Sequence, residues 1–144
     1  MSPNPQKRKG SAWERQAVAI LNEHIKSSKW FRISGSGAIG TIIDEPILMG
    51  DIKGKVDSVP KKFKGEAKVG YSNRKEGEAK SFTMQKEWLD KIREEADLDY
   101  SLPFLICKFD NARSGTRAFV SLDLDTFVYL INYITELKDT LDNG

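Results

Sequence analysis

The run Glu66-Ala67-Lys68 carries a carboxylate and an ammonium two residues apart. It lies in residues 63–69, where apolar and polar residues alternate as they do in a half-buried β-strand. Residues two apart on a strand share one face, so we expect the Glu66 and Lys68 side chains to lie side by side. A lone Glu-x-Lys pair also occurs on ordinary protein surfaces, so a third group is needed before the pattern indicates chemistry.

Asp51 supplies that third group, because it follows a glycine in the otherwise apolar residues 47–52, 15 residues before Glu66. A charged side chain in an apolar strand is costly unless it is paired. If the two strands are neighbours, two carboxylates and a lysine converge. Two hard oxygen ligands suit Mg²⁺, which also takes waters and phosphate oxygens. Such a metal would polarise a phosphate and help to form hydroxide, while Lys68 positions or deprotonates the water or offsets transition-state charge.

The elements that must position these residues follow from hydrophobic periodicity. Ser11 and Glu14 form a capping-box pattern, which predicts that a helix begins near Ser11. Residues 1–9 are expected to be a disordered basic arm, and residues 10–144 one domain. The remaining pattern predicts strands at 30–33, 47–52, 63–69, 103–109 and 117–122, a helix from Ser81 or Thr83, and an added C-terminal helix at about 123–141. This order predicts an α/β fold, with a mixed central β-sheet flanked by helices.

Composition narrows the class of protein. The 144 residues are 39% hydrophobic and 31% charged, and no apolar run approaches the ~20 residues that a membrane-spanning helix needs. The N-terminus has no apolar segment typical of a secretory signal. A single cysteine, Cys107, and a single histidine exclude disulfide frameworks and Cys/His zinc sites. We therefore expect an intracellular protein.

Charge is distributed unevenly along the chain. Residues 1–80 carry 16 Lys/Arg against 9 Asp/Glu, whereas residues 81–144 carry 7 against 12. This asymmetry indicates that one face meets a polyanion, although scatter over a solvated surface is the alternative.

The pair Gly50-Asp51, the interval that follows and Glu66-Ala67-Lys68 together resemble the signature of PD-(D/E)XK nucleases, with glycine in place of proline. Further segments resemble archaeal-type Holliday junction resolvases, over roughly residues 8–109. Residues 9–15 are similar to the opening helix of that family with its Glu-Arg pair, residues 31–37 to its Arg-x-x-Gly-Ser region, and the helix bearing Gln85 to the one after its polar loop. Residues 41–49 are longer than the family's usual link, which leaves Asp44 and Asp57 as rival ligands.

The resemblance implies a restriction-endonuclease-like fold and a Mg²⁺-dependent endonuclease, with Mn²⁺ able to substitute. The enzyme would act as a homodimer that resolves four-way DNA junctions by paired symmetric nicks. Asp51, Glu66 and the backbone carbonyl of Ala67 would bind the metal, Glu14 would bind it directly or through water, and Lys68 would orient the attacking water. The residues implied to contact DNA are Arg15, Arg32, Ser34, Ser36, Lys53, Lys55, Lys62 and Gln85.

Other interpretations stay open at this point. Glu14 could serve only the capping box, and the lysines could only solvate a strand edge. The same signature is compatible with another PD-(D/E)XK endonuclease of repair, replication or restriction. A non-catalytic DNA-binding module is the alternative of a different class.

Overall fold

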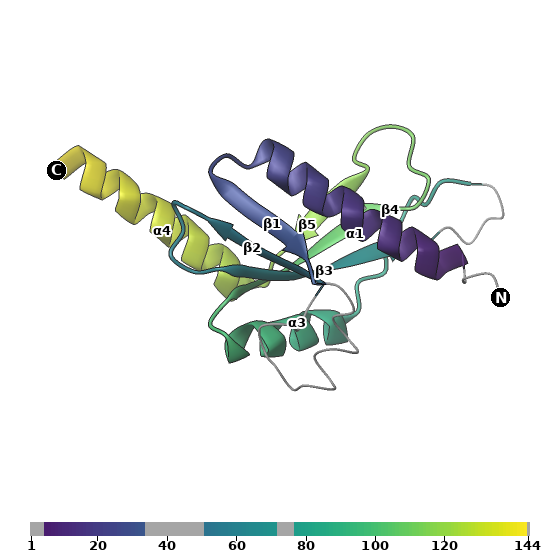
Figure 1. The fold of residues 1–144 in the computed structure, drawn as a ribbon, viewed down its shortest axis with the longest axis horizontal. Helices are drawn as coiled ribbons and strands as arrows, with labels where there is room; N and C mark the ends of the chain where they lie inside the picture. The colour runs from purple at the N-terminus through teal and green to yellow at the C-terminus, as the bar shows by residue number, and fades with distance from the viewer. Residues whose placement is uncertain (1–4, 34–50, 72–76, 144) are drawn as a thin grey trace.

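The computed structural model describes residues 5–33, 51–71 and 77–143. Three helices and five strands lie in these ranges (Figure 1). In chain order they are α1 (Pro5–His24), β1 (Ser28–Arg32), β2 (Ile52–Val56), β3 (Phe63–Gly70), α3 (Lys86–Leu98), β4 (Leu102–Phe109), β5 (Ala118–Ser121) and α4 (Leu124–Asn143).

The strands form one sheet in the order β1-β2-β3-β4-β5. Neighbouring strands are antiparallel except β3 and β4, which are parallel and are joined through α3. The described elements thus confirm the predicted α/β fold with a mixed sheet and flanking helices. β3 is the third of the five strands, so the residues that carry the proposed chemistry sit on a strand with a neighbour on each side.

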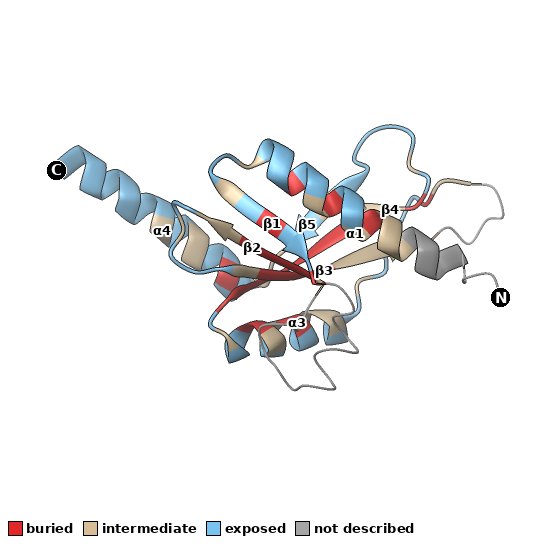
Figure 2. Cartoon of the chain, in the orientation of Figure 1, coloured by how far each residue is buried: buried red, intermediate tan, exposed pale blue. Residues whose placement is uncertain are grey.

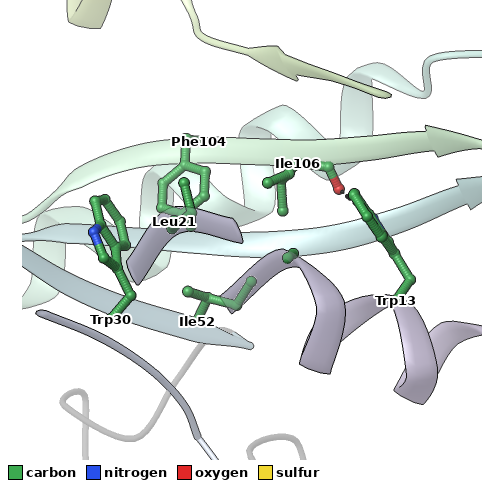
Figure 3. Close-up of a cluster of buried hydrophobic side chains, with 7 residues drawn as sticks. Trp13, Leu21, Trp30, Ile52, Phe104 and Ile106 are labelled. Atoms are coloured by element: carbon green, nitrogen blue, oxygen red, sulfur yellow. Dashed lines mark hydrogen bonds between the residues drawn. The ribbon is translucent and has the colours of Figure 1, made fainter. Parts of the chain in front are cut away.

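Helix α1 covers one face of the sheet with a strip of apolar residues spaced by four. The indole Nε1–H of Trp13 donates a hydrogen bond of 3.0 Å to the carbonyl of Ile106, which fixes the helix against β4 (Figure 3). Figure 2 shows the buried residues concentrated where α1 meets the strands. This core cluster consists of Trp13, Ala17, Leu21, Trp30, Ile52, Phe104 and Ile106.

Helix α3 covers the opposite face, where Ile92 packs against Leu105 and Cys107 of β4. The Cys107 thiol is buried as predicted, and burial raises its pKa to about 11. With α1 on one face and α3 on the other, the sheet is sandwiched between helices (Figure 1). The alternating residues of β3 therefore face two different helices. Ala67 packs on the α1 side of the sheet, and Glu66 points toward α3.

Several predicted boundaries were wrong. Helix α3 begins at Lys86 and not at Ser81 or Thr83, so Gln85 precedes this helix and does not lie on it. Helix α1 begins at Pro5 and not near Ser11, so residues 5–9 are helical and not a disordered arm. Proline is well suited to the first helical position, and residues 6–9 are good helix formers, which outweighs the cost of Gly10 inside the helix.

The second strand begins at Ile52, whereas residues 47–50 of the predicted strand lie outside the described residues. The sequence of this strand is too polar to show an apolar strand pattern. It is buried nevertheless, and Gly54 leaves room for the ring of a neighbouring strand. A Cβ atom at Gly54 would lie 2.1 Å from Trp30.

Helix α4 begins where Asp123 accepts a hydrogen bond of 2.9 Å from the backbone N–H of Thr126, as an N-cap does. The helix then runs past the edge of the sheet, and most of it is exposed (Figures 1 and 2). Among the helices that the structure describes, none is long and apolar enough to cross a bilayer.

Candidate active site

The pairing of β2 with β3 brings Asp51 beside Glu66. Ile52 is opposite Gly65 in the antiparallel register, and the Asp51 N–H donates a hydrogen bond of 2.9 Å to the Gly65 carbonyl. The Asp51 side chain then crosses to β3, where its Oδ2 accepts a hydrogen bond of 3.1 Å from the Ala67 N–H. Two residues 15 positions apart in sequence therefore meet at one end of the strand pair, as expected for the case in which the two strands are neighbours.

Glu66 is buried between β3 and α3, with two lysines against its carboxylate. Lys68 Nζ lies 3.5 Å from Oε2, and Lys91 Nζ of α3 lies 3.3 Å from Oε1. The Lys68 ammonium also lies 4.6 Å from the centre of the Trp88 ring, a cation–π contact that orients it. Glu66 Oε2 accepts no hydrogen bond from the residues that the structure describes.

Burial and neighbouring carboxylates disfavour the ionised form of Asp51. The pKa of Asp51 is raised from 3.8 to about 6, chiefly by burial and then by the charges of Glu66 and Glu14. The Ala67 N–H and the Lys68 ammonium act in the other direction but do not cancel the effect. The site therefore holds carboxylates that a bound cation would stabilise.

The residues fit a hard divalent cation such as Mg²⁺. Asp51 and Glu66 would provide carboxylate oxygens and the Ala67 carbonyl a third hard oxygen, and Glu66 Oε2 keeps unused lone pairs. Among residues 5–33, 51–71 and 77–143, no group of three or more His, Cys, Asp or Glu side chains is arranged to hold a metal. Within these ranges the candidate carboxylate ligands are the pair Asp51 and Glu66, and two carboxylates are compatible with Mg²⁺ because this ion usually retains several waters.

Glu14 lies near the site but is directed to a different partner. Its Oε2 is 3.1 Å from a guanidinium nitrogen of Arg32 on β1, and both side chains are partly exposed. The capping-box interpretation is wrong, because Ser11 lies within α1 and not before it. Arg15, the next residue, is exposed on the same helix.

The rival aspartates are separated by their positions. Asp57 is exposed beyond the far end of β2, about 20 Å of strand away from Asp51. Asp57 therefore cannot bind the same metal ion as Glu66. Asp44 lies outside the described residues, as do Ser34 and Ser36.

The predicted DNA contacts divide into exposed and enclosed side chains. Lys53 is only 6% exposed, and Lys55 donates hydrogen bonds to the carbonyls of Val56 and Val59, so neither lysine is presented as an open phosphate contact. Lys62 is exposed, and so is Gln85, which precedes α3 as its N-cap residue without a side-chain capping bond.

Three site residues on α3 were missed from the sequence: Trp88, Lys91 and Glu95. The charge of Glu66 is the largest influence on Lys91 and raises its pKa, while burial and then the Glu66 charge raise the pKa of Glu95. The available signal was their spacing, since Lys91 and Glu95 border the apolar stripe that contains Trp88 and Ile92.

Comparisons with known proteins agree with this chemistry at the level of a family. A family model described as "Phage putative PDDEXK endonuclease" matches residues 5–139. Among solved structures, the Holliday junction resolvase Hjc from the archaeal hyperthermophile Archaeoglobus fulgidus is similar, with 17% sequence identity and a TM-score of 0.46. The similarity covers 71% of this chain and 69% of Hjc, and it is too distant to transfer a substrate. A comparison with curated protein sequences finds no significant match.

Proposed function

The chain belongs to the phage PD-(D/E)XK endonuclease family, and from this premise we propose that it cleaves branched DNA by divalent-metal-dependent hydrolysis, with the four-way junction as its preferred substrate. Family membership agrees with the restriction-endonuclease-like fold expected from the sequence. It establishes a nuclease, while the metal, the catalytic residues and the form of the DNA are parts of the proposal.

The observation that carries the proposal is the contact between Asp51 and β3. The hydrogen bond from the Ala67 N–H fixes the Asp51 carboxylate beside Glu66, and Lys68 lies within 3.5 Å of the same glutamate. These contacts support a motif in which two carboxylates and a carbonyl oxygen would bind the metal beside a lysine.

Each residue has a distinct task in this mechanism. Asp51, Glu66 and the Ala67 carbonyl would hold Mg²⁺, which when bound polarises the phosphate and lowers the pKa of water. Lys68, oriented by the Trp88 ring, positions the attacking water in line with the scissile bond and offsets the charge that develops on phosphorus oxygens. Water adds to phosphorus as the bond to the 3′ oxygen breaks, which leaves a 5′-phosphate and a 3′-hydroxyl.

The contacts to DNA are proposed for the side chains around this site. Arg15, Arg32, Lys62 and Gln85 are exposed, and Ser34 and Ser36 belong to the same set. Contacts to phosphates provide affinity without sequence information, which suits recognition of shape. A homodimer with two symmetric sites would match the two-fold symmetry of a four-way junction.

The proposal is tested by comparing cleavage of one labelled four-way junction with cleavage of linear duplex, flap and single-stranded DNA at equal salt. We expect paired nicks in the junction that require Mg²⁺ or Mn²⁺. Equal rates on all four substrates would refute junction preference and favour a repair, replication or restriction endonuclease of the same family.

Substitutions separate catalysis from binding. Glu66→Gln and Lys68→Ala are expected to reduce cleavage by at least about 100-fold while leaving most junction binding intact. Asp57→Asn is the matched control, since Asp57 is exposed at the far end of β2, and it should cleave normally. If Glu66→Gln and Lys68→Ala cleave like the wild type, the site is wrongly assigned. Binding that ignores metal, with no cleavage of any DNA, would favour a non-catalytic module.

A further inference from the structure

Helix α4 presents an apolar seam that the rest of the described chain does not cover. The helix is attached through Thr126, which is buried, and through Tyr129, Leu130 and Tyr133, which are half-buried. Every residue from 134 to 143 is exposed. On a different face, six large apolar residues are 45–81% exposed: Leu124, Phe127, Val128, Ile131, Ile134 and Leu141.

The start of α4 is nevertheless firmly fixed to the body of the protein. Arg93 of α3 forms a hydrogen-bonded ion pair with Asp123 and lies 3.6 Å from Asp125. Lys61 lies 5.2 Å from the centre of the Tyr129 ring. These contacts hold the first half of the helix, so its second half leaves the body in a set direction, as Figure 1 shows.

The seam follows a heptad spacing. With Leu124 and Ile131 at a positions, Phe127, Ile134 and Leu141 fall at d positions, and the third a position is Lys138. An apolar stripe of this kind is the surface that helices bury against each other. Most helical stability in proteins comes from packing of an apolar face, and residues 134–143 are all exposed, so a partner on this face would stabilise the second half of α4.

We propose that α4 pairs antiparallel with α4 of a second copy of this chain. In this register Leu124 lies against Leu141 of the second copy, and Ile131 lies against Ile134. Lys138 then lies opposite Phe127 of the second copy, where its stem packs on the ring and its ammonium can lie over it. A parallel pair would instead place two Lys138 ammonium groups against each other, so charge favours the antiparallel arrangement.

Charge also separates a second copy from other occupants. Residues 124–143 carry four acidic residues and one lysine, so this helix would be repelled by DNA and by anionic membranes. In a pair of α4 helices, Asp125, Glu136 and Asp139 fall at b and f positions, away from the seam, so they do not face each other across it. The apolar residues of the seam expose on the order of 600 Å² per chain, close to the ~800 Å² per partner of a standard interface. A two-fold pairing uses this same patch twice, which a closed dimer requires.

This pairing would form the interface of the homodimer in the proposed function, and the inference rests on that proposed function to this extent. Cleavage does not enter the test, however. A monomer that still cleaves DNA would refute the pairing and leave the nuclease assignment intact, whereas an inactive dimer would do the reverse.

Sedimentation equilibrium of the full chain without DNA tests the interface. We expect a mass of about 33 kDa, twice the 16.3 kDa of one chain. Ile131→Asp places a carboxylate in the seam and should weaken association by more than about tenfold. Asn132→Asp adds the same charge on an exposed face of α4 and should not weaken it. A monomer at all concentrations, or a dimer that survives Ile131→Asp, would overturn the proposal. Circular dichroism verifies that each variant is folded.

Disulfide trapping tests the direction of the pair. The variants Leu124→Cys and Leu141→Cys are oxidised separately and as a mixture, with the native Cys107 buried and out of reach. Antiparallel helices give disulfide dimers only in the mixture, because Leu124 meets Leu141 and not itself. Dimers that form with each variant alone would show parallel pairing and refute the arrangement. A mixture that fails to cross-link although the wild type is dimeric would equally refute it.

Discussion

Asp51→Asn is expected to abolish cleavage and, at the same time, to stabilise the metal-free protein at neutral pH. The pKa of Asp51 is raised from 3.8 to about 6 by burial and by the charges of Glu66 and Glu14. The folded protein therefore binds a proton at Asp51 more tightly than the unfolded chain does. The stability associated with that proton is lost as pH rises between about 4 and 6.

The magnitude follows from the size of this pKa difference. A difference of about two pH units corresponds to about 3 kcal/mol of folding free energy at pH 7.5. Asparagine cannot ionise, and its amide oxygen can still accept the hydrogen bond from the Ala67 N–H. We therefore expect Asp51→Asn to raise the free energy of unfolding by up to about 3 kcal/mol at neutral pH.

Urea unfolding in EDTA, followed by tryptophan fluorescence, measures this difference at two pH values. Near pH 4.5 the gain should shrink to about 1 kcal/mol, because Asp51 is then protonated in the folded wild type. Asp57→Asn is the control, and its effect should stay within about 0.5 kcal/mol because Asp57 is exposed. Mg²⁺ should stabilise the wild type and not Asp51→Asn.

Two results would refute the reasoning. Equal stability of Asp51→Asn and wild type at pH 7.5 would mean that the Asp51 carboxylate is not strained by burial and neighbouring charge. An equal gain at both pH values would mean that the substitution acts through packing and not through ionisation.

Three further predictions concern the frame of the site. Gly65→Ala should lower the free energy of unfolding in urea by about 2 kcal/mol, because the new Cβ atom would lie 2.4 Å from the Phe104 ring; an unchanged midpoint would contradict this packing. Lys64→Ala removes the ammonium 2.8 Å from Asp99 and should cost about 3 kcal/mol in the same assay, whereas a loss below 1 kcal/mol would mean that the pair is solvated. Cys107 is buried with its pKa raised to about 11, so a thiol reagent at pH 8 should modify it only as fast as the protein unfolds; fast modification of the native protein would contradict its burial.

The parts of the fold that the sequence predicted well are those with a strong local pattern. β3 alternates apolar and polar residues, and β4 is a nearly continuous apolar run flanked by parallel and antiparallel neighbours. Glu66 and Lys68 lie on one face of β3 because a period of two determines this directly. The contact with Asp51 followed from the additional assumption that the two strands are paired.

The parts that could not be predicted depend on distant residues. β2 looks polar in sequence, and it becomes a central strand because the Trp30 ring from β1 packs against Gly54. The sequence likewise gives Lys53 and Lys62 the same chemistry, although one is buried and the other exposed. Burial of a lysine depends on what covers it, and that covering comes from elements that are remote in sequence.

Helix α3 shows how one element assigns different tasks to similar residues. Lys64 and Lys68 lie on the same face of β3, each two residues from Glu66, so the period of two alone does not separate them. The C-terminal end of α3 brings Asp99 to Lys64, which is fully buried and pairs within the fold. The N-terminal part brings Trp88 over Lys68, which stays partly exposed beside Glu66. Because α3 runs antiparallel to β3, a shift of this helix by one turn would break both the contact of Asp99 with Lys64 and the contact of Trp88 with Lys68. The position of α3 therefore determines both the stability of the strand and the geometry of the site.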